Sequence, residues 1–150
     1  MPADPPFHQL LEKMKAAGAE GLRLPPPVFE TFGAEVVGHE EGRSLTVRFP
    51  VEERWQNPMG MMQGGVLAAL VDNVLGPLSY LVAPPSVTTE LNVTFLRPVT
   101  PDAEWVEVRG EVVEVMRTRL VLKAEVTDPR GRRVALAQAA CLVVGRRAAG

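Results

Sequence analysis

The residues best suited to chemistry lie in one stretch, Asn57 to Val82, which begins as a polar, glycine-rich loop and continues as an almost wholly apolar run. Asp72 is the only ionised side chain in this stretch. A carboxylate in such a place can activate a water molecule or attack a carbonyl carbon itself. Just before the apolar run, Gly64 and Gly65 offer backbone N–H groups where a helix would begin, and such donors stabilise an oxygen that gains negative charge. These are the groups that acyl transfer requires.

The element that must position these groups is a long helix, predicted from about Gly64 to Val82 because no turn signal interrupts the run before Pro77. The run is apolar nearly all round, which predicts a helix buried in the core. One stripe of this helix nevertheless carries only small residues besides Asp72. The space in front of the Asp72 carboxylate suits a ligand or a closely approaching second chain. The stripe consists of Gly65, Ala68, Ala69, Asp72, Gly76 and Ser79.

A membrane span is the alternative interpretation of this run, and three observations oppose it. An aspartate at the centre of a span costs on the order of 2.5–3.5 kcal/mol. The run is barely long enough to cross a bilayer, and no charged flanks would orient it. The sequence therefore predicts a core helix and no membrane partner.

Alternating apolar and polar residues predict strands on both sides of the helix. A phase slip at Val112–Val113 predicts a β-bulge. An antiparallel sheet must wrap around an apolar helix to bury it, so the predicted fold class is α+β, with a curved antiparallel sheet around one long central helix. The predicted strands cover residues 34–40, 44–49, 87–96, 105–115, 120–126 and 134–144.

The remaining sequence fits one domain with a short N-terminal extension. An amphipathic helix is predicted from Phe7 to about Gly18, and Pro25–Pro27 forms a rigid connector. We therefore divide the chain into an N-terminal helix and connector (1–31), the main domain (32–145) and a tail (146–150).

Composition excludes several classes of protein. The 46% hydrophobic and 23% charged residues are typical of a globular protein. A net charge of −2 gives no electrostatic reason to expect a nucleic acid as partner. The single Cys141 excludes an internal disulfide, and the N-terminus lacks the pattern of an export signal, so a cytoplasmic location is expected.

The pattern Asn57-x-x-Gly60-x-x-Gln63-Gly64-Gly65, followed by Asp72, resembles the active-site segment of the hotdog-fold acyl-CoA thioesterases of the phenylacetate-degradation type. The similarity continues through residues 88–98, TTELNVTFLRP. It departs at one position, because this family usually carries histidine where the chain has glutamine. The resemblance implies a hotdog fold over residues 32–145 and an acyl-CoA substrate, with no cofactor beyond the coenzyme A of that substrate. It also implies a homodimer, or a homotetramer built as a dimer of dimers, with sites at the subunit interface.

The resemblance further implies a role for each residue. Asp72 is the catalytic base or nucleophile, and the N–H of Gly65 binds the developing oxyanion. Gln63 polarises the thioester carbonyl through its amide, although an amide cannot transfer a proton. Asn57 holds the water or braces the loop, and Thr88 helps to place the water. The residues expected to contact substrate besides these are Gly60, Gly64, Asn73 and Gly76.

Each of these residues also has a structural alternative. Asp72 could be bonded to a neighbouring backbone group, and the paired glycines could simply form a tight turn into the helix. Asn57 could be an ordinary turn residue, and Thr88 could reflect β-propensity alone. Whether Asp72 is catalytic or structural, its carboxylate, if buried, needs a hydrogen-bonding partner or a raised pKa.

Helix geometry adds a constraint that the motif does not contain. Gln63 and Asp72 are nine residues apart, which is roughly 13 Å along a regular helix. One thioester carbonyl cannot contact both residues of the same helix. A working site must therefore take its donors from one subunit and its carboxylate from another.

Two other functions remain open. A hotdog protein that binds acyl-CoA or another lipid-like ligand without turnover is compatible with Gln63. A hotdog dehydratase fits the sequence less well. Its chemistry pairs a carboxylate with a histidine, and no histidine follows His39 in the sequence. With His8 as the only other histidine, no metal site is expected. Cys141 lies in an apolar strand and is assigned to packing. The candidates for contact with coenzyme A phosphates are Arg97, Arg117, Arg119, Arg130, Arg132 and Arg133.

Overall fold

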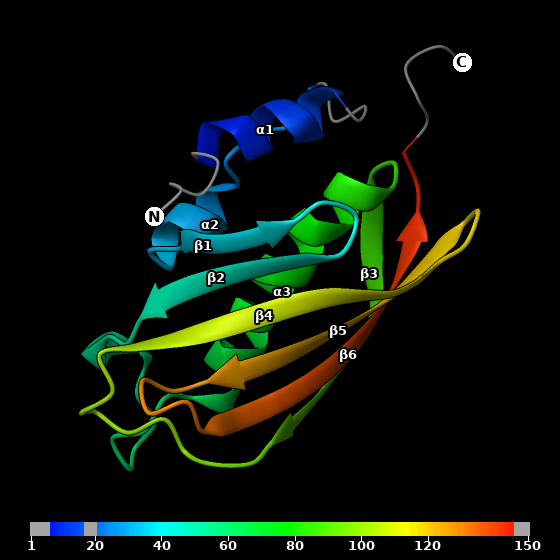
Figure 1. The fold of residues 1–150 in the computed structure, drawn as a ribbon. Helices are drawn as coiled ribbons and strands as arrows, with labels where there is room; N and C mark the ends of the chain where they lie inside the picture. The colour runs from blue at the N-terminus through cyan, green and yellow to red at the C-terminus, as the bar shows by residue number, and fades with distance from the viewer. Residues whose placement is uncertain (1–6, 17–20, 146–150) are drawn as a thin grey trace.

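The computed structural model describes residues 7–16 and 21–145 of the chain. It contains three α-helices, a 3-10 turn and six strands, arranged as one sheet with α3 lying across one of its faces (Figure 1). The helices are α1 (Phe7–Ala16), α2 (Pro27–Thr31) and α3 (Gly64–Val82), and the 3-10 turn spans Glu53–Trp55. The strands are β1 (Glu35–Glu40), β2 (Ser44–Pro50), β3 (Ser86–Phe95), β4 (Trp105–Val115), β5 (Arg119–Thr127) and β6 (Arg133–Val143).

The sheet is antiparallel with strand order β1-β2-β4-β5-β6-β3. Strand β3 therefore does not pair with β4, which follows it in the chain. It pairs with β6 at the far edge of the sheet, and residues 96–104 carry the chain back to β4. This arrangement is the hotdog fold, a curved sheet around one central helix, and it confirms the predicted fold class.

The core lies between α3 and the sheet. Six aliphatic side chains on one side of α3 are buried: Leu67, Leu70, Val71, Val74, Leu75 and Leu78. They pack against the inward side chains of the strands, and the fit is closest at Gly110 of β4. A Cβ atom added there would lie 2.9 Å from Leu75 Cδ2 and 3.2 Å from Val74 Cγ1. The sheet can approach the helix so closely because this position has no side chain.

The predicted strands all form, with ends within two residues of those expected. The predicted bulge is confirmed, because the pairing of β4 with β5 shifts register between Val112 and Glu114. Helix α1 begins at Phe7 as expected, whereas its predicted end near Gly18 lies outside the described residues. The helix α2 and the 3-10 turn were not anticipated. Proline suits the first position of a helix, which explains why the connector becomes helical at Pro27.

The expectation that α3 would be buried all round is wrong. Gly65 and Asp72 are exposed in the chain, and Ala68, Ala69 and Gly76 are only half-buried. By length and composition α3 could cross a membrane, but its apolar face is buried against the sheet. Because β3 is an edge strand, the sheet ends beside the small-residue stripe and leaves it open except at Ser79, which is buried and accepts a hydrogen bond from Ser86 of β3.

A buried carboxylate organises the turn between β5 and β6. Asp128 Oδ1 accepts hydrogen bonds from the backbone N–H groups of Arg130 and Arg132, each at 3.0 Å, and Oδ2 accepts one from Arg132 Nε at 2.9 Å. Burial opposes ionisation, but these donors outweigh it and hold the pKa of Asp128 below its ordinary value.

Asp128→Asn is expected to lower the free energy of unfolding by about 1–3 kcal/mol at pH 7, because the charge-assisted bonds are lost. A depressed folded-state pKa contributes stability above the unfolded pKa of about 3.9, and this contribution disappears as pH falls through the folded pKa. Urea unfolding from pH 7 to pH 2, with the exposed Glu104→Gln as control, measures the difference. A deficit that stays constant at all pH values would contradict this account.

Candidate active site

The first half of the site lies where α3 begins. The carbonyl of Gln63, the residue before the helix, accepts hydrogen bonds from Val66 N at 3.0 Å and Leu67 N at 3.1 Å. The N–H groups of Gly64 and Gly65 have no acceptor among the residues that the structure describes. The exposed side-chain amide of Gln63 likewise bonds to none of the described residues. Two unpaired N–H donors at the positive end of a helix are suited to bind an oxyanion.

The loop before the helix is braced by Asn57. Its Oδ1 accepts hydrogen bonds from the N–H groups of Met59 at 2.9 Å and Met61 at 3.1 Å. Gly60, between them, has φ +80°, a conformation that favours glycine. The geometry therefore supports the bracing role for Asn57 and accounts for Gly60 by backbone conformation. Only the side-chain nitrogen of Asn57 remains for a substrate.

The second half of the site is the carboxylate of Asp72 with Thr88 of β3. Thr88 Oγ1 donates a hydrogen bond to Asp72 Oδ1 at 3.0 Å. This bond supplies the partner that the carboxylate was expected to need, although both side chains are exposed in the chain rather than buried. A Cβ atom added at Gly65 or Gly76 would meet no atom within 4 Å, so the stripe on both sides of Asp72 is open.

Asn73 is the one predicted contact residue that the structure turns away from this stripe. It is 8% exposed, and its Nδ2 donates a hydrogen bond to the Ala69 carbonyl at 2.8 Å. One residue along a helix is a rotation of about 100°, which carries the side chain from the open stripe to the packed face. Its position next to Asp72 in the sequence therefore does not place it at the substrate.

The two halves do not meet within one chain. Helix α3 is unbroken from Gly64 to Val82, so the expected separation of roughly 13 Å between Gln63 and Asp72 holds for the folded chain. The carboxylate with its threonine and the oxyanion donors with their braced loop are therefore two half-sites on one open stripe.

Sequence reasoning missed a set of apolar residues around the first half-site. An open hollow of about 320 Å³ lies between the loop and the end of β3, and its lining includes Asn57, Met61, Gly64, Phe95 and Leu96. Phe95 closes in on the helix start, because a Cβ atom at Gly64 would lie 3.3 Å from Phe95 Cζ. Phe95 is 51% exposed at the end of an edge strand, where an alternating pattern alone would have assigned it to the core.

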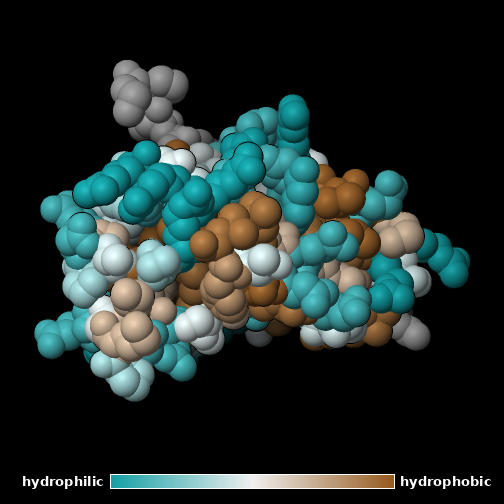
Figure 2. Space-filling model, turned by 90° about the horizontal axis from the view of Figure 1, so that it is seen from below, coloured by the Kyte–Doolittle hydropathy of each residue, from teal (hydrophilic) through white to brown (hydrophobic). Residues whose placement is uncertain are grey.

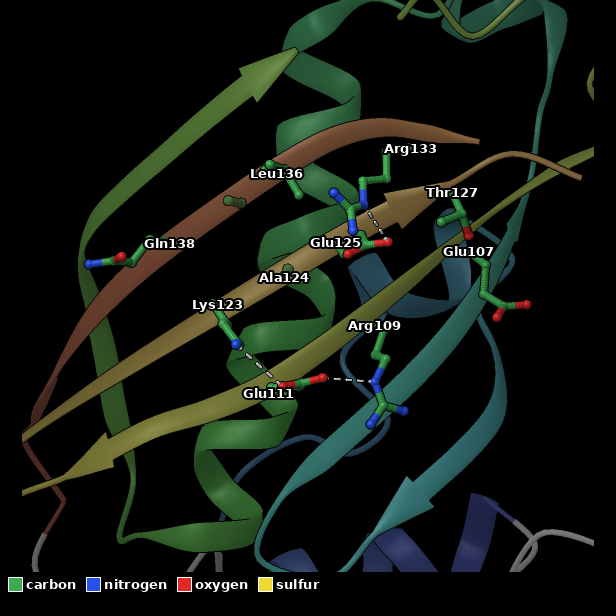
Figure 3. A pocket seen from close by; sticks show the side chains of 11 residues that line it. Glu107, Arg109, Glu111, Lys123, Ala124, Glu125, Thr127, Arg133, Leu136 and Gln138 are labelled. Carbon is green, nitrogen blue, oxygen red and sulfur yellow. Dashed lines mark hydrogen bonds and ion pairs between the residues drawn. The ribbon is translucent and has the colours of Figure 1, made fainter. Parts of the chain in front are cut away.

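A second hollow, of about 630 Å³, lies on the face of the sheet turned away from α3 (Figure 3). Its charged side chains all take part in ion pairs, most of them with one another, and Glu107 pairs with Arg48 outside the hollow. Arg109 and Lys123 contact Glu111 at 2.9 Å and 3.6 Å, and Arg133 contacts Glu125 at 3.2 Å. No acid or base there is left for catalysis, and we assign this network to the surface of the sheet.

The other candidate groups do not form sites. Among the described residues no cluster of three possible ligands could hold a metal ion. Cys141 is buried on β6, opposite Thr88 in the strand pairing. Burial, with a smaller contribution from the charge of Asp72, raises the pKa of its thiol. A thiol that resists ionisation is a poor nucleophile, which supports its assignment to packing.

Comparison with known proteins agrees with this geometry. Residues 59–135 match the family model described as the thioesterase superfamily. The proofreading thioesterase EntH of Klebsiella pneumoniae is 31% identical over 110 residues, covering 70% of this chain and 77% of the relative. The chain belongs to the thioesterase superfamily. It is a thioester hydrolase with a hotdog fold.

Solved structures of the same fold extend the comparison. The PaaI protein of the E. coli phenylacetic acid degradation operon has a TM-score of 0.79 at 18% identity, covering 94% of this chain and 97% of that one. A Streptococcus mutans protein solved with acetyl-CoA bound has a TM-score of 0.72 at 23% identity, covering 85% and 97%. At these identities the likeness concerns the fold alone.

Thr88→Val tests whether the Thr88 hydroxyl serves the thioesterase or only the strand. Valine keeps the β-branched shape but removes the bond to Asp72, and bonds to charged groups contribute about 1.5–3 kcal/mol. We expect kcat to fall about tenfold to a hundredfold while the protein stays folded at the assay temperature, whereas Thr88→Ser, the matched control, keeps most of the activity. Equal kcat for Thr88→Val and wild type would exclude a catalytic role for the Thr88 hydroxyl and leave Thr88 with a structural role in the strand.

Proposed function

We propose that this protein hydrolyses acyl-CoA thioesters in sites formed between two copies of the chain. The observation that carries the proposal is the separation of its two half-sites. Asp72 with Thr88 is complete in the middle of the open stripe, and the free N–H groups of Gly64 and Gly65 lie at its start, where the helix begins. For catalysis both half-sites must lie within a few ångströms of one substrate carbonyl group. A second copy of the chain can supply the half-site that is missing.

In this mechanism the substrate carbonyl oxygen accepts hydrogen bonds from Gly64 N–H, Gly65 N–H and the Gln63 amide of one chain. Asp72 of the second chain removes a proton from a water molecule, whose oxygen attacks the carbonyl carbon. Alternatively, the carboxylate attacks first, and water then hydrolyses the resulting anhydride. In the first route the proton that Asp72 removed from water passes to the coenzyme A sulfur as the C–S bond breaks. In the second route the coenzyme A thiolate leaves when the anhydride forms and takes its proton from solvent. The products are a carboxylic acid and coenzyme A, and no other cofactor is required.

The exposed surface next to the stripe supports the same arrangement. Strand β3 pairs on one side only, with β6, and most of its residues are exposed. A long unpaired edge strand is a template for pairing with another chain. A second copy that covers β3 and the stripe would enclose Asp72, which the reaction needs in a water-poor environment.

Gln63 tests the oxyanion half of the proposal. If its amide polarises the carbonyl, Gln63→Ala should lose about 2.7–4 kcal/mol of transition-state stabilisation, the usual cost of removing one oxyanion donor. Gln63→His restores a donor and should retain or raise kcat. Steady-state hydrolysis of a panel of acyl-CoAs, followed by free-thiol release, measures all three proteins. Equal rates would exclude Gln63 from catalysis, and binding without turnover by all three would favour a ligand-binding protein.

Mixing two inactive variants tests the shared site. Asp72→Asn should lose at least about two orders of magnitude in kcat, the usual scale for a general base. When Gln63→Ala and Asp72→Asn chains are unfolded together and refolded, each mixed dimer contains one intact site and one site with both lesions. Random pairing makes half of the dimers mixed, so activity should return to about a quarter of wild type in a two-fold dimer.

The control is each variant refolded alone, which should stay inactive. Subunit exchange must be demonstrated separately, with chains of two different tags co-purified from the mixture. If the chains exchange and the mixture stays as inactive as its parents, the site lies within one chain.

A further inference from the structure

The two half-sites differ in the side chains that surround them. Figure 2 views the end of the molecule where α3 begins and shows apolar side chains gathered there among hydrophilic ones. The second half-site instead has buried polar side chains beside it. Ser79 of α3, Ser86 of β3 and Cys141 of β6 are 1%, 7% and 1% exposed, and none of them reacts in the proposed mechanism. Buried polar groups are normally hydrogen-bonded, so their partners indicate what this cluster does.

The hydroxyl protons of the cluster can be assigned by elimination. The Gly76 carbonyl and the Asp72 carboxylate can only accept hydrogen bonds. Ser79 Oγ lies 2.6 Å from the Gly76 carbonyl and must donate to it, so Ser86 Oγ, at 3.0 Å, must donate to Ser79 Oγ. Thr88 Oγ1 must likewise donate to Asp72 Oδ1. Ser86 and Thr88 have therefore used their protons, and only their lone pairs remain for another partner.

Cys141 supplies the one proton that is left. It lies opposite Thr88 in the pairing of β3 with β6, and its thiol is within hydrogen-bonding reach of the Thr88 and Ser86 hydroxyls. Burial raises the pKa of the thiol, so its proton stays on sulfur at neutral pH. Neither hydroxyl has a proton to give, so the thiol must be the donor. Thr88 is the better acceptor of the two, because a hydroxyl that donates to a carboxylate is polarised by it.

The backbone around Thr88 is held on both sides. The pairing of β3 with β6 shifts register just after Thr88, where Thr89 Oγ1 donates to the Ala140 carbonyl at 3.1 Å. Ser86 lies two residues earlier on the same face of β3, and its bond to Ser79 ties the strand to α3. The freedom that remains to Thr88 is rotation of its side chain and hydroxyl, and a donor at Cys141 restricts that rotation.

We propose that Cys141 is a positioning residue of the hydrolysis, which donates its thiol proton to Thr88 and thereby keeps the Thr88 proton directed at Asp72. The inference rests on the proposed function, because Cys141 acts through the Asp72–Thr88 pair and is too buried to contact substrate. The Thr88 hydroxyl then occupies Asp72 Oδ1 in one orientation. Oδ2 is the oxygen that remains to activate the water molecule or to attack the carbonyl carbon.

A spectroscopic test of this hydrogen bond needs no substrate. The chain has a single cysteine, so the S–H stretching band in the infrared belongs to Cys141 alone. A thiol that donates a hydrogen bond absorbs at a lower frequency than a free thiol. We expect a lower frequency in wild type and in Ser86→Ala than in Thr88→Val, which lacks the acceptor. A band that Thr88→Val leaves in place would overturn the inference.

A kinetic test asks whether Cys141 acts through Thr88. Cys141→Ala should lower kcat for acyl-CoA hydrolysis about threefold to fivefold with KM unchanged, which corresponds to about 0.6–1 kcal/mol, the net contribution of one hydrogen bond. Cys141→Val fills the space without a donor and should show the same loss, whereas Cys141→Ser restores a donor and should recover most of the activity. In a Thr88→Val background, Cys141→Ala should have no further effect on kcat.

Three kinetic results contradict the positioning role. They are wild-type kcat in Cys141→Ala, a loss in Cys141→Ser as large as in Cys141→Ala, and an equal loss in the wild-type and Thr88→Val backgrounds. The last result would mean that Cys141 supports the fold rather than the Thr88 hydroxyl. The proposed function can fail separately. If wild type hydrolyses no acyl-CoA, the role in hydrolysis falls with it, whereas the infrared band still shows whether the thiol donates to Thr88.

Discussion

The constraint on which the rest of the structure depends is the regular backbone of α3. A hydrogen-bonded helix cannot bring its first turn to a residue more than two turns further along, so Gly64 and Asp72 are held apart by a rigid element. The same rigidity makes each half-site well defined. The positive end of the helix fixes two N–H donors, and Asp72 is fixed beside β3, where Thr88 bonds to it. The helix thus fixes the position of both groups and holds them too far apart to contact one carbonyl group within one chain.

Strand β3 follows this helix in the chain and lies at the edge of the sheet. Strand β3 carries Thr88 to the carboxylate at one end and Phe95 to the helix start at the other, so it contributes to both half-sites. In this position it leaves one side of its backbone unpaired and the stripe of α3 uncovered. The unpaired edge of β3 and the uncovered stripe of α3 would make a single chain prone to aggregation. A second copy would use the same two features to complete the proposed site.

The charged side chains on the outer face of the sheet and those beside the first half-site differ in how they are paired. On the face of the sheet turned away from α3, arginine, lysine and glutamate alternate across strands and neutralise one another, as Arg109 and Lys123 do with Glu40 and Glu111. Surface pairs of this kind contribute little to stability individually and leave no net field. Beside the first half-site, Arg97 bonds to the Arg133 carbonyl and to no carboxylate of the described residues.

The sequence by itself determined the elements and indicated the candidate reacting groups. Alternation and helical periodicity are local properties, so the strands, the bulge after Val112 and the long helix could be read from the chain. The motif from Asn57 to Asp72 indicated the family for the same reason, because its spacing is encoded within one loop and one helix. Only the tertiary structure decided that β3 lies beside β6, that Phe95 is exposed and that Asn73 turns into the core. These depend on which distant segments compete for the same sheet edge and the same face of α3, and that free-energy balance is not contained in any local pattern.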